Sequence, residues 1–207
     1  MVPEKVAAIL SWSSPKSLFE VWSFHGLASF FRKFIREFSG ICTRMLDTIK
    51  RASQRFQWTK AVEKSFQILK KKIIERPILR LLDFNKHFQV CCDASGTAIG
   101  AIHSQEDKCV AYFSENLNDG RQKYSSYEKE FYVVVQALKY WRHHFLGNEF
   151  VLFSDNSALQ YIMQQHRLNH KHAKWVEYLQ SYTFLLKYIS GHANKVADTL
   201  SKRALLL

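Results

Sequence analysis

The stretch from residue 88 to residue 114 most limits the folds open to this chain. It holds three short β-prone runs, FQVCCD, GAIHS and KCVAYFS, which glycine and charged turn residues separate. Such runs predict three successive strands. Two further strand-like runs, EFVLFSD and YTFLLKYIS, come later and alternate with segments of helical period. A meander of strands followed by strand–helix alternation predicts an α/β domain built on a mixed sheet.

The helical segment after the meander has a well-marked start. Ser125 and Glu128 in YSSYEKEF fit a capping box, in which each side chain satisfies a backbone N–H group at the helix start. The apolar positions that follow recur with helical rather than alternating period. Further helices are predicted in SALQYIMQQ, in RLNHKHAKWVEYLQS and in NKVADTLSKR.

Residues 1–76 differ in character from residues 77–207 and predict a small helical subdomain. In WTKAVEKSFQILKKKIIERP, apolar residues fall on one helix face, with Thr59 as the N-cap and Pro77 just beyond the end. The residues of that face are Val62, Phe66, Leu69 and Ile73. Gly26 is expected to divide the aromatic-rich segment upstream into two short helices. The interleaved aromatic and cationic residues leave two interpretations open, a solvated surface or a surface that faces nucleic acid.

The charge of the chain indicates a polyanionic partner, since the net charge is +12. Residues 1–76 hold 15 Lys and Arg against 6 Asp and Glu, whereas residues 77–207 hold 15 against 12. No apolar stretch approaches the roughly 20 residues of a membrane helix, and the N-terminus lacks a secretory signal pattern. The four cysteines show no CxxC spacing, which favours free thiols in a reducing compartment. We therefore expect an intracellular protein, of the cytoplasm or nucleus, that contacts no membrane.

Four carboxylates occupy positions that an ordinary core would not give them. Asp93 and Asp155 each end an apolar strand-like run, Glu130 lies on the apolar face of its helix, and Asp198 starts the last predicted helix. Each of them alone has a structural explanation, as a turn or helix cap, a first-turn acid or a rim salt bridge. If the two strands are parallel neighbours, their carboxyl ends share the crevice in which open α/β sheets bind ligands.

Such a group of carboxylates suits hard divalent cations. Clustered carboxylates repel one another, and their pKa values rise unless a cation neutralises them. Mg²⁺ prefers octahedral oxygen ligands and completes its shell with water and substrate phosphate. Two such ions about 4 Å apart clamp the attacking water and the leaving oxygen of a phosphodiester. With a basic chain to attract the polyanion, the four acids predict a metal-ion site for phosphodiester hydrolysis.

At these residues the sequence resembles the ribonuclease H domain of gypsy-type LTR retrotransposon polyproteins. The matching stretches keep the family's order over about residues 80–203 and are CCDASGTAIGAI, VAYFSENLNDGRQKYSSYEKEFYVVVQALKYWRHHFLG, FVLFSDNSALQYI and NKVADTLSKR. Residues 1–76 resemble the segment between the polymerase palm and the ribonuclease H domain, through VPEKVAAILSW, VWSFHGLASFFRKFIREFS and FQWTKAVEKSFQILKKKI.

The resemblance implies a ribonuclease H-like fold, with a five-stranded mixed sheet flanked by helices and preceded by the small helical subdomain. It also implies endonucleolytic hydrolysis of the RNA strand of RNA/DNA hybrids, with two Mg²⁺ ions for which Mn²⁺ substitutes. The family's metal-binding and catalytic acids fall on Asp93, Glu130, Asp155 and Asp198, with Glu128 a rival for the second place. Hybrid recognition would use 2′-hydroxyl and phosphate contacts, and other duplexes are further candidate partners. The candidate nucleic-acid-binding residues are Ser95, Asn156, Lys174, His192, Lys202 and Arg203.

Departures from the family pattern keep a second reading open. Cys92 replaces the usual Thr before the first acid, Asn156 replaces the usual His after the third, and ADTLSK stands for ADALSR. The loop SGHANKVAD is short, which puts a catalytic role for His192 in question. The paired aspartates of a polymerase are absent, so no DNA synthesis is expected. The alternative is a catalytically inactive, nucleic-acid-binding relic; another nuclease or transposase of the superfamily is disfavoured by EKEF and ADTLSK.

Three histidines in QHRLNHKHAKW raise the question of zinc. No Cys or further His completes a tetrahedral set at a recognisable spacing around His166, His170 and His172. A solvated basic surface that touches phosphate is the preferred interpretation of this segment.

Overall fold

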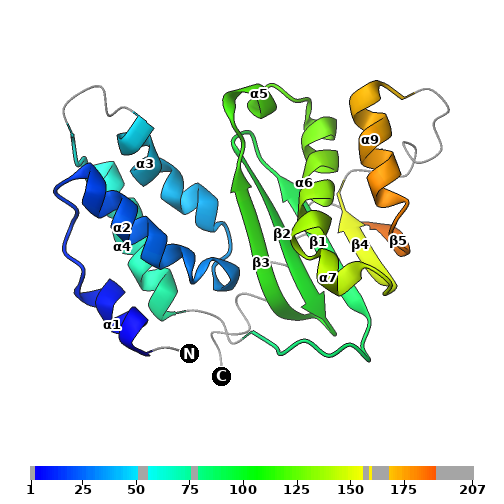
Figure 1. Ribbon diagram of the computed structural model, residues 1–207, viewed down its shortest axis with the longest axis horizontal. Helices are drawn as coiled ribbons and strands as arrows, with labels where there is room; N and C mark the ends of the chain where they lie inside the picture. The colour runs from blue at the N-terminus through cyan, green and yellow to red at the C-terminus, as the bar shows by residue number, and fades with distance from the viewer. Residues whose placement is uncertain (1–2, 51–55, 76–78, 156–158, 160–167, 190–207) are drawn as a thin grey trace. The chain divides into compact units, whose positions relative to one another are not determined.

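The computed structural model describes residues 3–50, 56–75, 79–155, 159 and 168–189 (Figure 1). The chain divides into two compact units, Met1–Pro77 and Ile78–Leu207. Each unit has a hydrophobic core of its own.

The first unit is helical throughout its described residues. Its elements are α1 (Pro3–Ser11), α2 (Leu18–Ser29), the 3-10 turn η1 (Arg32–Phe34), α3 (Phe38–Lys50) and α4 (Lys60–Ile74). Phe24 and Phe66 are fully buried at its centre, with ring centroids 4.6 Å apart. Many of the aromatic residues of this basic segment therefore form a core rather than a surface.

Helix α4 forms as its sequence predicts. The Thr59 hydroxyl accepts a hydrogen bond from the backbone N–H of Val62 at 3.3 Å and so caps the first turn. The predicted apolar face, Val62, Phe66, Leu69 and Ile73, is buried. Both predictions for this helix are confirmed.

The prediction of a break at Gly26 is wrong. Helix α2 continues through Gly26 and ends at Ser29, and the backbone N–H of Phe30 closes its last turn. A glycine inside a helix costs only about 1 kcal/mol relative to alanine. Burial of Val21, Phe24 and Ala28 on one side of the helix outweighs that cost.

The second unit is built on a five-stranded mixed sheet, as predicted. Its strands are β1 (Phe88–Ala94), β2 (Ala98–Gln105), β3 (Lys108–Asn116), β4 (Phe150–Ser154) and β5 (Phe184–Tyr188), in the spatial order β3-β2-β1-β4-β5. The first three pair antiparallel, whereas β4 pairs parallel with both β1 and β5. The central strand β1 is therefore antiparallel to one neighbour and parallel to the other.

Helices cover one face of this sheet. In the described residues they are α5 (Asp119–Gln122), α6 (Ser126–Tyr140), α7 (Arg142–Phe145) and α9 (His170–Leu179). Figure 1 shows α6 and α9 side by side in front of the strands. Alternate residues of β1, namely Phe88, Val90 and Cys92, are buried in the same core as Phe131 and Val134 of α6. This packing fixes which residues of α6 face the sheet.

The segment that leads into β1 is fastened by Gln105. The Gln105 side chain is fully buried, and its amide donates to the carbonyls of Asp83 at 2.7 Å and Lys86 at 3.2 Å. Its oxygen accepts the Asp83 N–H at 3.0 Å. Both polar atoms of this buried side chain therefore form hydrogen bonds to the backbone of the segment that precedes β1.

All four cysteines, Cys42, Cys91, Cys92 and Cys109, are free, as predicted. Burial raises the pKa of the Cys42 thiol to about 12 and that of Cys109 to about 11. None of the helices in the described part of the chain has both the length and the apolar character needed to cross a bilayer.

Candidate active site

Asp93 lies on β1, and Asp155 directly follows β4, the parallel neighbour of β1. In the ladder between β1 and β4, Cys91 pairs with Phe153. Asp93 follows Cys91 by two residues, and Asp155 follows Phe153 by two residues. Because side chains alternate along a strand, Asp93 lies on the same face of β1 as Cys91, and Asp155 is the first residue beyond the end of β4. This register confirms that β1 and β4 are parallel neighbours, which is the condition that the sequence prediction set for their acids to share one crevice.

Glu130 reaches the same region from the helix. Its side chain is only 8% exposed, although it carries a carboxyl group. Its Oε1 atom accepts a hydrogen bond from the backbone N–H of Ala94 at 3.2 Å, and Ala94 directly follows Asp93. Its Oε2 atom is buried and has no hydrogen-bond partner within the described structure. An unpartnered buried carboxylate oxygen is costly and calls for a further partner.

The charges of Asp93 and Asp155 act on the pKa of Glu130. Burial, followed by the negative charges of Asp155 and then Asp93, raises the pKa of Glu130 to about 8. The hydrogen bond from Ala94 acts in the opposite direction but is the weaker influence. A carboxyl group in this state is protonated at neutral pH unless a cation compensates its charge.

Glu128, the rival for the second position, is engaged elsewhere. It completes the predicted capping box with Ser125, whose backbone N–H donates to it at 3.0 Å. It also accepts a hydrogen bond from the ammonium group of Lys171 on α9. These contacts, that of Lys171 foremost, lower the pKa of Glu128 to about 2 against the effect of burial. Its charge is thus already paired inside the protein.

The turn between β1 and β2 lies directly beside Asp93. The Ser95 hydroxyl donates to the Ala98 carbonyl at 2.8 Å and accepts the Ala98 N–H at 3.0 Å. The ammonium group of Lys129 donates to the Gly96 carbonyl at 3.3 Å. Ser95, a candidate contact for nucleic acid, is exposed, and its hydroxyl also holds the turn closed.

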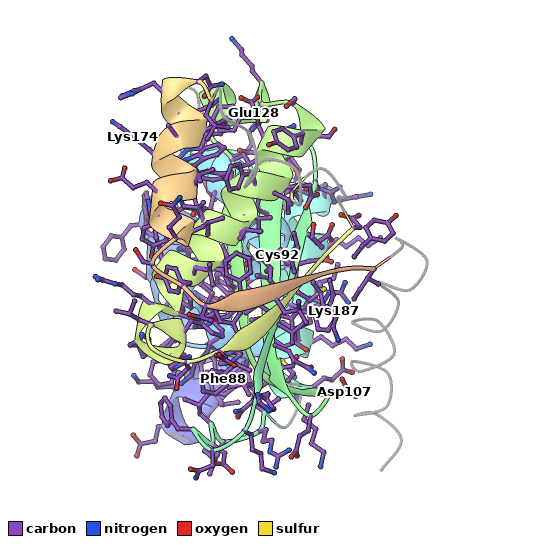
Figure 2. The ribbon with its side chains drawn as sticks, turned by 90° about the vertical axis from the view of Figure 1, so that its right-hand side faces the viewer. Phe88, Cys92, Asp107, Glu128, Lys174 and Lys187 are labelled. Atoms are coloured by element: carbon purple, nitrogen blue, oxygen red, sulfur yellow. The ribbon has the colours of Figure 1, made fainter. Side chains whose placement is uncertain are left out.

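Helix α9 differs in part from its prediction. Lys174 is exposed and is labelled on the outer side of this helix in Figure 2, as a contact with nucleic acid would require. His172 is not solvated: its ring packs against Tyr127, Phe131 and Trp175, and its Nε2 atom lies 3.4 Å from Glu128 Oε1. The expectation of a solvated surface is therefore wrong for His172. The apolar spacing of α9 turns that residue towards α6.

The remaining predicted site residues lie outside the described part of the chain. These are the acid Asp198 and the candidate nucleic-acid contacts Asn156, His192, Lys202 and Arg203. His166 lies outside it as well.

The described acids fit a divalent cation by their chemistry. Their side chains do not form a ready-made group of three or more metal ligands in residues 3–50, 56–75, 79–155, 159 and 168–189. Glu130 nevertheless offers a buried oxygen without a partner, and Asp93 and Asp155 are near enough to disfavour its charged form. A cation bound between the three carboxylates would instead stabilise the charged form of Glu130. The donor set contains only carboxylate oxygens, which are the ligands of Mg²⁺ and Mn²⁺.

Lys171 is a residue near the site that the sequence analysis did not single out. Its ammonium group lies 4.0 Å from the ring centroid of Tyr124 and 5.5 Å from that of Trp175. Glu128 and Lys171 are 43 residues apart in the sequence. Only the packing of α9 on α6 brings the two together, so no local sequence pattern would have shown the pair.

Comparison with known proteins identifies the second unit. Residues 83–182 match the model of the RNase H-like domain found in reverse transcriptase. The match begins just before β1 and includes Asp93, Glu130 and Asp155.

Nearly the whole chain is also similar to retrotransposon polyproteins. It is 37% identical over 204 residues to the retrovirus-related Pol polyprotein from transposon 297 of Drosophila melanogaster, covering 97% of this chain and 19% of the relative. It is 31% identical over 208 residues to the transposon Tf2-3 polyprotein of Schizosaccharomyces pombe, covering 96% and 16%. The chain thus spans less than a fifth of the length of these relatives. The resemblance to retrotransposon polyproteins is confirmed.

Solved structures confirm the fold. The foamy viral protease-reverse transcriptase in complex with an RNA/DNA hybrid superposes with a TM-score of 0.80 at 21% identity, over 92% of this chain and 27% of that one. The same protein in complex with double-stranded DNA gives a TM-score of 0.80 over 92% and 42%. The predicted ribonuclease H-like α/β fold is therefore correct.

Proposed function

We propose that this protein is a retrotransposon-derived ribonuclease H, which cuts the RNA strand of RNA/DNA hybrids endonucleolytically and depends on Mg²⁺. The observation that carries the proposal is Glu130, a buried glutamate with one unpartnered oxygen beside two acids at parallel strand ends. A structural role does not account for this arrangement, because it lowers the stability of the fold. Such destabilised groups are typical of functional sites.

Asp93, Glu130 and Asp155 would hold the divalent ions, with Asp198 as the fourth acid. When bound, Mg²⁺ or Mn²⁺ would supply activation of a water molecule and stabilisation of the charge on the departing oxygen. The protein's own contribution is to place the carboxylates. The parallel pairing of β1 and β4 supports the placement of two of them side by side, and the hydrogen bond from the Ala94 N–H would orient Glu130.

Other residues of the chain serve substrate binding in this proposal. Ser95, beside Asp93, and the exposed Lys174 would contact sugar or phosphate, as would Asn156, His192, Lys202 and Arg203. Such contacts recognise the shape and the 2′-hydroxyls of a hybrid rather than its bases. The basic helical residues 1–76 would be the end of a reverse transcriptase that helps to hold the duplex. The chain contains no polymerase site, so we expect no DNA synthesis by it.

The test is a comparison of substrates under one condition. Purified protein is incubated in Mg²⁺ with labelled RNA/DNA hybrid, duplex RNA and duplex DNA, beside an Asp155→Asn variant. We expect internal cuts in the RNA strand of the hybrid alone, and none from the variant. If the folded wild-type protein binds the hybrid and never cuts it, the protein is an inactive nucleic-acid-binding relic and the proposal fails.

A further inference from the structure

The position of Glu130 depends on the backbone that carries it. Its carboxyl group makes a single hydrogen bond in the described structure, from the Ala94 N–H at 3.2 Å, and Oε2 makes none. A side chain held by one contact takes its place mainly from its helix. Glu130 is the fifth residue of α6, so whatever fixes the first turns of α6 also fixes this carboxylate.

Those turns are tied from two sides. Towards α9, Glu128 accepts hydrogen bonds from the Ser125 N–H at 3.0 Å and from Lys171. Towards the sheet, Lys129 donates to the Gly96 carbonyl at 3.3 Å. Residues two apart on a helix point in nearly opposite directions. Glu128 therefore holds the helix from the side opposite to the one on which Glu130 serves the site.

The bond between Glu128 and Lys171 is more fixed than an ordinary surface ion pair. The side chains are only 21% and 36% exposed. The Lys171 ammonium lies over the ring of Tyr124 at 4.0 Å, which limits its freedom to turn away. Figure 2 shows Glu128 at the end of α6 that lies beside the start of α9.

We infer that Glu128 and Lys171 are positioning residues for the metal site: by joining the first turn of α6 to α9, they set the place of the Glu130 carboxylate. This inference rests on the proposed function. Neither residue touches metal or substrate, and Glu128 acts through the helix that it shares with Glu130. Outer partners that orient ligands contribute about 10- to 100-fold to metal affinity or activity, and a displacement of about 1 Å is enough for such losses.

The helix pair offers a matched control at its other end. There the Lys139 ammonium of α6 lies 5.4 Å from the ring centroid of Tyr178 on α9. Lys139→Met removes a cation from the same helix interface, far along α6 from Glu130. Lys171→Met and Glu128→Gln remove the proposed contact, and glutamine retains an oxygen for the capping box. Lys171→Arg retains the charge and the stacking.

Two measurements separate positioning from stability. Calorimetry with Mn²⁺ gives the metal dissociation constant, and hybrid cleavage gives kcat, KM and the Mg²⁺ requirement, with unfolding curves for every variant. We expect Lys171→Met and Glu128→Gln each to weaken metal binding about tenfold and to lower kcat at unchanged KM. The double variant should be no worse than either single variant, because both remove the same contact. Lys171→Arg and Lys139→Met should stay within about twofold of wild type.

The outcomes distinguish this inference from the proposed function. Suppose that wild-type protein binds metal and cuts the hybrid, and that Lys171→Met matches Lys139→Met in both measurements. The pair of Glu128 and Lys171 is then only structural: the inference is wrong and the proposed function stands. If losses in the double variant multiply, the two residues act separately and the inference is again wrong. If the wild type neither binds metal nor cuts, the proposed function fails, and the inference with it.

Discussion

Replacing Glu130 by glutamine should stabilise the metal-free protein while abolishing its activity. The pKa of Glu130 is raised from 4.5 to about 8 in the fold, chiefly by burial. A folded-state pKa above the unfolded value means that stability is fully present below pH 4.5 and is lost as the pH rises through about 8. At about 1.4 kcal/mol per pH unit, the wild type loses about 5 kcal/mol over this window.

Glutamine has no charge to bury, so the variant escapes this loss. Its amide nitrogen takes the place of the unpartnered oxygen at a cost of about 1–3 kcal/mol, which does not change with pH. The difference in unfolding free energy between variant and wild type should therefore grow by about 4 kcal/mol between pH 5 and pH 8.5. Titrating groups that do not interact with Glu130 cancel, because both proteins contain them.

The assay is urea unfolding in a chelator at the two pH values, followed by repetition in Mg²⁺. We expect the free energy of unfolding of the variant to increase relative to that of the wild type as the pH rises. We also expect Mg²⁺ to stabilise the wild type alone. A pH-independent difference would show that Glu130 does not sit as a buried acid facing Asp93 and Asp155, and would refute the reasoning.

Three further predictions concern the stability of the second unit. His103 is fully buried among aromatic rings, and burial and then the neighbouring His144 and His143 lower its pKa from 6.5 to about 3. The fold should lose about 5 kcal/mol as the pH falls through that window, and acid unfolding of His103→Phe should show a flatter profile. Gln105→Leu removes three hydrogen bonds to the partly buried backbone of Asp83 and Lys86 and should cost about 3 kcal/mol in denaturant unfolding, whereas an unchanged midpoint would show that these bonds do not stabilise the fold. Ser125→Ala should cost about 1 kcal/mol by the same assay, and a neutral result would mean that the capping box adds nothing.

Local patterns predicted much of this structure correctly. Strand composition gave the five strands, and the capping box at Ser125 and the cap at Thr59 both form. These features depend on neighbours within a few residues, so a sequence displays them directly. Gly26 was misjudged because core burial on one side of α2 outweighs a local propensity of about 1 kcal/mol.

The site was only partly predictable from the sequence. The aspartates at two strand ends and the glutamate on an apolar helix face were visible as residues out of place. The position of Asp93 relative to Asp155 depends on how β1 pairs with β4. The pairing of Glu128 with Lys171 depends on the packing of two helices. Long-range geometry of this kind leaves no local pattern in one sequence. It favours Glu130, whose Oε2 atom has no partner in the described structure, over Glu128, whose charge is paired with Lys171.

Hybrid cleavage by the wild type and Asp93→Asn, side by side, tests the central claim most directly. Asp107→Asn is the matched control, since it removes the same charge at the β2–β3 turn, well away from Glu128 in Figure 2. Asn also tolerates the positive φ of 59° at that position. The account predicts Mg²⁺-dependent cutting of the RNA strand by the wild type and Asp107→Asn, and none by Asp93→Asn. Equal cutting by all three proteins would contradict it.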